Sequence, residues 1–173
     1  MKKLNIGSGW DYKKGWINLD LNKNFKPDVV HDLDKLPLPF EDNTFDYILC
    51  SNVLEHMDNQ VALLDELWRI CKPGGKIEVH VPHYSHYTAH GDLTHKNNYS
   101  RCSFWHYQGI PKYYSDTAVF KVWNVVYKTD ALFKGFLKNF IEFFLNQSSM
   151  ATELIFSKFL PTAQIQFKLE VIK

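Results

Sequence analysis

Residues 4–20, LNIGSGWDYKKGWINLD, begin with a glycine turn and end with a carboxylate. An apolar run leads into Gly7-Ser8-Gly9, and a second apolar run ends at Asp20. Only six residues lie between Gly9 and Trp16, whereas a crossover between parallel strands usually takes a dozen or more residues and contains a helix. The stretch therefore predicts a glycine turn and an acidic strand end that are joined without the usual helix.

The glycine turn does not suit a pyrophosphate. A dinucleotide fingerprint needs a third glycine and a helix N-terminus that receives the pyrophosphate. Here Tyr12 occupies the third position, and the Gly-Lys-Ser/Thr of a phosphate-binding P-loop is also absent. A lone Gly-x-Gly is more often an ordinary tight turn, so the ligand has to be inferred from the residues that follow.

Two acids supply that information. Asp20 ends the second apolar run, and Asp32 in VVHDL ends the third. Because a carboxylate only accepts hydrogen bonds, Asp20 suits the hydroxyls of a ribose and Asp32 suits the exocyclic amine of adenine. A glycine turn followed by these two acids predicts a nucleoside site without phosphates, and S-adenosylmethionine is a ligand of this kind.

The first half of the chain is predicted to form a parallel α/β sheet. Apolar runs between turn signals predict strands at 3–6, 16–20, 28–32, 45–50 and 76–81. An amphipathic helix is predicted over 59–71, with Asp58 as its N-cap and the KPGG at 72–75 as its stop. A strand, a helix and a strand in succession indicate a right-handed parallel crossover.

The second half predicts long loops over 82–117, a strand over 119–127, a helix over 131–145 and a final strand over 164–172. The last strand alternates apolar and polar residues, which is typical of an antiparallel strand with one solvated face. We expect one domain over 1–173. The helix carries five phenylalanines; a core or lid helix is favoured, with a membrane surface, a lipid tail or an oligomer contact as alternatives.

These motifs resemble the class I S-adenosylmethionine-dependent methyltransferases. LNIGSG looks like their glycine loop, WINLD like their ribose strand, and LDELWRICKPGGKIEVHVPH like their helix and turn before strand five. The chain is most similar to a short subgroup that runs from the glycine loop straight into G-W-I-N-L-D. The resemblance implies a Rossmann-like, doubly wound, mostly parallel sheet with an antiparallel C-terminal strand pair. The first crossover helix would be missing, and residues at about 129–163 would be an aromatic helical insertion.

The resemblance also implies roles for individual residues. The glycine loop would lie under the methionine and ribose, Asp20 would hold the ribose hydroxyls, and Asp32 would take the adenine amine. GDLTH, residues 91–95, stands where the subgroup carries Asp-Pro-x-His, with Leu93 in place of the proline. The full set of expected cofactor contacts is Gly7, Ser8, Gly9, Asp20, Leu21, Asp32, Leu33, Ser51, Asn52 and His56, with Glu55 facing the same cleft or serving as an ordinary surface carboxylate.

Five of the eight histidines fall in HVPHYSHYTAHGDLTH, residues 80–95. Their spacings match no common zinc signature, so no metal is predicted. The alternative is acid–base chemistry, because an acceptor hydroxyl must lose a proton and histidine titrates near neutral pH. His83 and His95 are the candidate bases and Tyr84 a candidate substrate contact, although a purely structural role is the commoner one for any single histidine.

The bulk composition excludes several functional classes. A formal net charge of +1 and the absence of a basic, aromatic-interleaved run argue against nucleic acid as a partner. No signal peptide or membrane span is evident and the three cysteines form no C-x-x-C pair, so we expect a cytoplasmic protein with reduced thiols. Aromatic walls for a sugar ring would come from Trp105, Tyr107, Tyr113 and Tyr114, unless these only pack the surface.

Together these features predict a methyltransferase that uses S-adenosylmethionine and acts on a small molecule, a glycan or a lipid-linked saccharide, at oxygen. Two alternatives stay open. The first is a catalytically inactive nucleoside-binding or partner-binding protein of the same fold, and the second is a histidine-based metal hydrolase. The sequence does not predict the oligomeric state.

Overall fold

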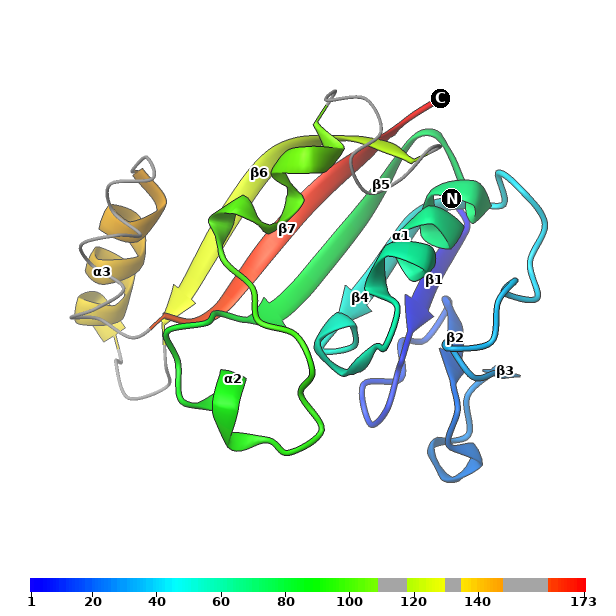
Figure 1. Ribbon diagram of the computed structural model, residues 1–173, viewed down its shortest axis with the longest axis horizontal. Coiled ribbons are helices and arrows are strands. Elements are labelled where there is room, and N and C mark those ends of the chain that lie inside the picture. Colours follow the sequence, from blue (N-terminus) through cyan, green and yellow to red (C-terminus); the bar gives the residue numbers. More distant parts are fainter. Residues whose placement is uncertain (109–117, 130–134, 148–161) are drawn as a thin grey trace.

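The computed structural model describes residues 1–108, 118–129, 135–147 and 162–173 (Figure 1). Its seven strands form one sheet in the order β3-β2-β1-β4-β5-β7-β6. Strands β1 to β5 pair in parallel, and β7 is antiparallel to both of its neighbours. The predicted Rossmann-like sheet with an antiparallel C-terminal pair is confirmed. The bounds are Lys3–Ile6, Ile17–Asp20, Val29–Val30, Phe45–Ser51, Cys71–Pro82, Val119–Thr129 and Thr162–Ile172 for β1 to β7.

The helices of the described ranges are short. They are α1 (Gln60–Ile70), α2 (Thr88–Gly91) and α3 (Gly135–Gln147), with 3-10 turns η1 (Lys23–Phe25), η2 (Leu54–His56) and η3 (Arg101–Tyr107). The predicted N-cap of α1 is wrong by one residue. The side chain of Asn59 accepts from the backbone N–H of Ala62, whereas Asp58 pairs with Lys96 at 2.8 Å. No helix of the described residues has the length and apolar character needed to cross a membrane.

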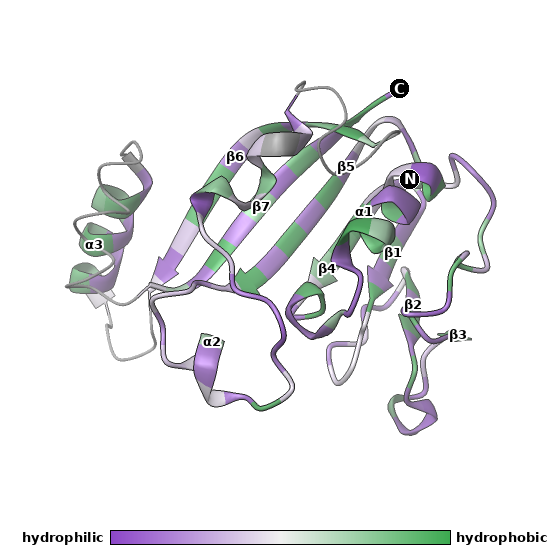
Figure 2. Ribbon diagram, viewed as in Figure 1, coloured by the Kyte–Doolittle hydropathy of each residue, from purple (hydrophilic) through white to green (hydrophobic). Residues whose placement is uncertain are grey.

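One face of the sheet is apolar and forms the core. Side chains alternate along β5 and β7, so that hydrophobic and hydrophilic residues appear as stripes (Figure 2). The buried apolar residues of α1 belong to the same core cluster as the buried apolar residues of β4 and β5. From η3, the ring of Phe104 lies 4.5 Å from that of Phe167 on β7. The core thus lies between the sheet on one side and α1 and η3 on the other.

On the opposite face, a loop replaces the helix that usually follows β1. Asn5 and Asn18 are neighbours on β1 and β2 and are both buried. The amide of Asn5 donates to the carbonyl of Asp11 at 2.8 Å, and Asn18 accepts from the N–H of Lys13 at 2.8 Å and donates to its carbonyl at 3.0 Å. Loop 10–16 is therefore held against the sheet by side chains. The predicted absence of the first crossover helix is confirmed.

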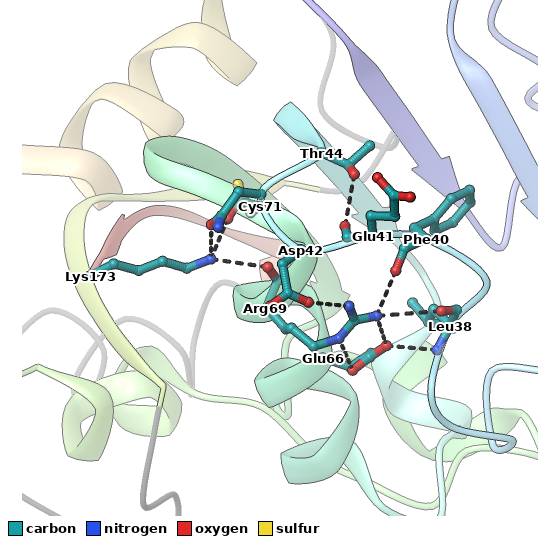
Figure 3. A network of polar contacts seen from close by, with 10 residues as sticks. Leu38, Phe40, Glu41, Asp42, Thr44, Glu66, Arg69, Cys71 and Lys173 are labelled. Carbon is teal, nitrogen blue, oxygen red and sulfur yellow. Dashed lines mark hydrogen bonds and ion pairs between the residues drawn. The ribbon is translucent and has the colours of Figure 1, made fainter.

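The connection from β3 to β4 also lacks a helix, and an arginine of α1 holds it in place (Figure 3). The guanidinium of Arg69 pairs with Asp42 and with Glu66, each at 2.5 Å, and donates to the carbonyl of Phe40 at 2.8 Å. Glu66 in turn accepts from the backbone N–H of Leu38 at 2.6 Å. The loop is thus fixed to the C-terminal end of α1, next to the start of β4.

Helix α3 lies beside β6 (Figure 1) and is only partly covered in the described structure. Ile141 and Leu145 are buried, and Asn146 accepts from the N–H of Tyr127 on β6 at 2.8 Å. Its other large apolar side chains are exposed: Phe136, Leu137, Phe140, Phe143 and Phe144. The predicted helix began at residue 131; residues 131–134 lie outside the described part of the chain.

Candidate cofactor and acceptor site

The glycine loop is shaped by close contact with the end of β4. Gly7 has φ +59°, and a Cβ added to it would lie less than 3.0 Å from Cγ2 of Val53. The backbone N–H of Ser8 donates to the carbonyl of Leu19 at 3.0 Å. The Ser8 hydroxyl is buried and has no hydrogen-bond partner among the described residues. The loop therefore carries a polar atom that a ligand could satisfy.

Asp20 contacts this loop directly. One carboxylate oxygen accepts from the N–H of Gly9 at 2.7 Å, and the other accepts from the N–H of Asn22 at 2.8 Å. A carboxylate has about four lone-pair sites, so capacity remains for two ribose hydroxyls. The next residue, Leu21, is largely exposed. The structure thus brings together the glycine turn, the predicted ribose acid and the predicted adenine contact.

Asp32 lies at the end of the neighbouring strand. The N–H of His31 donates to the carbonyl of Asp20 at 3.1 Å, which extends the pairing of β2 with β3 to the residue before Asp32. The Asp32 carboxylate accepts from the N–H of Asp34 at 3.1 Å, and Leu33 packs partly buried against the core. The two predicted cofactor acids therefore lie on adjacent strand ends.

The sequence interpretation did not single out one aromatic pair beside the loop. Trp10, directly after Gly9, is 90% exposed, and its ring lies 4.7 Å from that of Phe25, edge to face. An aromatic side chain in this position offers a stacking surface for a planar base. The available signal was a tryptophan adjacent to the glycine turn in a loop too short to bury it.

Ser51 and Asn52 end β4 as predicted, and a polar chain connects Ser51 to β5. Asn52 has φ +53°, and its N–H donates to the carbonyl of His80 at 2.9 Å. The Ser51 hydroxyl lies 3.5 Å from Nδ1 of His80, whose Nε2 lies 2.7 Å from Glu78. The hydrogen bond from His80 lowers the pKa of Glu78 to about 2. This chain lies on the polar face of the sheet.

Glu55 and His56 follow in η2, and His95, from the loop after α2, lies close to both. One potential ligand atom from each of these three residues lies within 4.8 Å of the other two. The rings of His56 and His95 are 4.8 Å apart. The Glu55 side chain is fully buried, and this burial raises the pKa of its carboxyl to about 7. The carboxylate at the start of η2 is thus part of a buried cluster, not an exposed helix-start residue.

His83 occupies a different environment from His95. It is fully buried, its Nδ1 lies 2.8 Å from the Ser85 hydroxyl, and its ring packs on those of Tyr84 and Tyr127. A side chain without exposed surface is poorly placed to take a proton from a bound acceptor. Of the two candidate bases, the geometry favours His95.

The predicted aromatic walls do not form a common surface in the described structure. Trp105 is exposed, whereas Tyr107 is buried, with its ring 5.5 Å from that of Phe120. Tyr107 is therefore a core residue and not a sugar contact. Tyr113 and Tyr114 lie outside the described residues.

A separate cavity of about 390 Å³ lies between α1 and η3. Its lining includes Gln60 and Val61 from α1 and Ser103 and Phe104 from η3. None of the predicted cofactor residues or candidate bases lines it, so it is distinct from the site at the strand ends.

Comparisons with known proteins agree with this arrangement. Residues 7–79 match a family model described as a methyltransferase domain. A SAM-dependent methyltransferase from Archaeoglobus fulgidus aligns with 98% of this chain and 85% of its own length, at a TM-score of 0.63 and 16% identity. A putative methyltransferase from Bacillus halodurans aligns with 99% of this chain and 93% of its own length, at a TM-score of 0.61 and 13% identity. The match to the methyltransferase-domain model covers less than half of the chain, and the likeness to the two solved structures shows that the chain shares their fold.

Curated relatives match this chain over a segment of similar length. An uncharacterised protein from Methanocaldococcus jannaschii is 44% identical over 70 residues, which are 36% of this chain and 28% of that protein. A demethylmenaquinone methyltransferase from Oceanobacillus iheyensis is 32% identical over 75 residues, 40% of this chain and 31% of that protein. The matched segments thus span about a third of these relatives. The family match ends at residue 79, before His83 and His95.

Proposed function

We propose that the chain transfers a methyl group from S-adenosylmethionine to an acceptor. The observation that carries this proposal is the hydrogen bond between the N–H of Gly9 and Asp20, because it joins the glycine turn to the ribose acid inside the matched segment. The buried, unsatisfied Ser8 hydroxyl and the Asp32 carboxylate on the next strand end fit the same cofactor. Together they offer hydrogen bonds to a nucleoside.

When bound, the cofactor would supply the methyl group on its sulfonium, and an acceptor oxygen would displace the neutral thioether. The chain would contribute mainly by holding the acceptor in line, since positioning alone can contribute up to about 7–11 kcal/mol. The hydroxyl proton would go to a base, for which His95 is the candidate. Its side chain is only 10% exposed and belongs to the cluster with Glu55 and His56.

A small-molecule acceptor is supported by the relatives named demethylmenaquinone methyltransferases. We extend the proposal to transfer to oxygen and to a saccharide or lipid-linked saccharide as acceptor, as expected from the sequence. The exposed phenylalanines of α3 support an acceptor with a lipid portion, because they leave apolar surface uncovered on a helix that packs on β6.

The first test is calorimetric titration with S-adenosylhomocysteine of the unaltered chain and of Asp20→Asn. The amide keeps one acceptor, for the N–H of Gly9, and loses both the charge and the acceptor for the N–H of Asn22. We expect the chain to stay folded and the dissociation constant to rise at least 10-fold. Asp34→Asn is the matched control, because Asp34 is an exposed acid of the neighbouring loop. No saturable binding to the folded chain would overturn the proposal.

The second test concerns turnover. Phenolic small molecules, free saccharides and lipid-linked saccharides would each be offered with labelled S-adenosylmethionine, and transfer of label would be measured. Label on one class identifies the acceptor. Tight binding of the cofactor without transfer to any class would favour the alternative of a nucleoside-binding protein of the same fold.

A further inference from the structure

Two separate loops bring three metal-ligating side chains together. Glu55 and His56 belong to η2, directly after β4, and His95 belongs to the loop after α2. One ligand atom from each lies within 4.8 Å of the other two. The predicted absence of a metal rested on the spacings within residues 80–95, whereas this cluster joins one histidine of that segment to a different part of the chain.

The Glu55 carboxylate lacks a counter-charge among the described residues. The side chain is fully buried, and neither of its oxygens has a hydrogen-bond partner there. Its own backbone carbonyl accepts from the N–H groups of Lys96 and Asn97 at 2.7 and 3.2 Å, which ties the His95 loop to η2. A buried, unpaired carboxylate is costly unless it is neutralised, hydrogen-bonded or bound to a metal.

The hydrogen bonds around His56 leave one ring nitrogen free to coordinate. The Thr94 hydroxyl donates its single proton to Asp92 at 2.6 Å, because an ionised carboxylate only accepts. The same hydroxyl oxygen lies 3.0 Å from Nδ1 of His56 and must therefore accept from it. With the proton on Nδ1, Nε2 of His56 carries the lone pair that a metal requires.

His95 is arranged in the same way. Its Nδ1 lies 3.4 Å from the carbonyl of Ala89, which can only accept, whereas its Nε2 lies 3.8 Å from an Asp92 carboxylate oxygen, beyond hydrogen-bond distance. This geometry favours the proton on Nδ1 and the lone pair on Nε2. Metal-binding histidines almost always donate their other ring N–H to a carbonyl, a carboxylate or a water. Both histidines of the cluster show this pattern.

We propose that Glu55, His56 and His95 form a binding site for a divalent transition-metal ion, Zn²⁺ being the ion that the ligand set suits best. Two imidazoles and one carboxylate are a recurrent zinc set that leaves a fourth position open for water or substrate. Ligand atoms about 2.0–2.1 Å from a tetrahedral Zn²⁺ lie roughly 3.4 Å apart. Small side-chain rotations would close the present separation.

The site lies just beyond the carboxyl end of β4, which the predicted cofactor contacts Ser51, its last residue, and Asn52, the next one, also occupy. An acceptor hydroxyl at the open position would lose its proton more readily, because a bound cation lowers the pKa of an oxygen ligand. The ion would then replace His95 in promoting deprotonation. This use of the site rests on the proposed function; the site itself does not.

The test is titration of the full chain with Zn²⁺ by calorimetry and with Co²⁺ by visible absorption, without the methyl donor. We expect one equivalent to bind and Co²⁺ to give ligand-field bands of a low-symmetry site. His56→Gln and His95→Gln should each raise the dissociation constant at least 10-fold. His90→Gln is the matched control, since His90 is exposed and lies outside the cluster, and it should leave binding unchanged.

Thr94→Val keeps the test decisive if either histidine variant fails to fold. Thr94 is exposed, and valine would remove its hydroxyl, with the hydrogen bond that orients His56 and the one to Asp92, and would leave all three ligands in place. We therefore expect a 10- to 100-fold weaker site. The absence of saturable Zn²⁺ and Co²⁺ binding would overturn the proposal, as would equal affinities in the Thr94→Val and His90→Gln variants. Binding of S-adenosylhomocysteine, titrated separately, reports on the proposed function independently.

Discussion

Replacing Gly7 by alanine tests whether the glycine loop is shaped by its contact with Val53. Two penalties should add at this position. Gly7 has φ +59°, and a left-handed conformation costs an L-residue roughly 1–2 kcal/mol. The new methyl group would also lie less than 3.0 Å from Cγ2 of Val53, a buried side chain, and such overpacking typically costs about 1–3 kcal/mol. We expect Gly7→Ala to destabilise the fold by roughly 2–5 kcal/mol.

Gly9→Ala separates the two penalties. Gly9 also has a positive φ, +46°, but a Cβ added there meets no atom within 4 Å. Only the conformational penalty of about 1–2 kcal/mol should apply. The two glycines belong to the same loop, so they share the local environment and differ mainly in the contact with Val53.

Urea unfolding would measure both variants together with Val53→Ala and the Gly7→Ala/Val53→Ala double variant. In the double variant the added methyl group faces only the Cβ of residue 53, at 3.6 Å in the present geometry, which is ordinary contact. We therefore expect a favourable coupling of roughly 1–3 kcal/mol. Equal losses at Gly7 and Gly9, or a coupling near zero, would refute the steric argument.

Two further outcomes follow from the polar networks. Glu78 has its pKa lowered from 4.5 to about 2 by His80, so its stabilisation, at most about 3 kcal/mol, is fully present above pH 4.5 and is lost as the pH falls toward 2. The free energy of unfolding, measured at pH 6 and pH 3, should fall more for the unaltered chain than for Glu78→Gln. Equal falls in the two proteins would contradict the stabilising role of the Glu78–His80 hydrogen bond. Arg69→Ala leaves the buried Glu66 carboxylate unpaired and should cost about 3–5 kcal/mol. Chemical denaturation of the Arg69→Ala/Glu66→Gln double variant should show a free energy of unfolding higher than that of Arg69→Ala alone. Equal values would mean that the loss does not come from the uncompensated charge of Glu66.

The sequence predicts the centre of the sheet well because burial on both faces leaves a strong apolar signal. Strand β1 has the predicted bounds, and β4 extends only one residue beyond its prediction. The edge is predicted less well. The expected strand at 28–32 shortens to Val29–Val30, since the Asp28 carboxylate accepts from the N–H of Asn18 and Asp32 begins a turn.

The candidate site could be predicted only where its residues follow strands. Gly9 and Asp20 come together because two parallel strands place their carboxyl ends at one edge. The meeting of His56 with His95 depends instead on the path of an irregular loop, which no periodicity encodes. Loop geometry likewise buries His83, since it forms an isolated bridge with Tyr99, and from the sequence alone His83 and His95 were equivalent.

The missing helix after β1 changes how the glycine loop is supported. A helix satisfies its own backbone, whereas the backbone of loop 10–16 needs outside partners. Asn5 and Asn18 supply them from inside the sheet, and Asn18 also bonds to Asp28 at 3.0 Å, which links the loop to the start of β3. Asparagine is unusual in a buried parallel strand. A pair of asparagines at neighbouring positions of β1 and β2 is therefore the sequence signal that a loop has replaced the helix, and the motifs LNIG and WINLD both carry it.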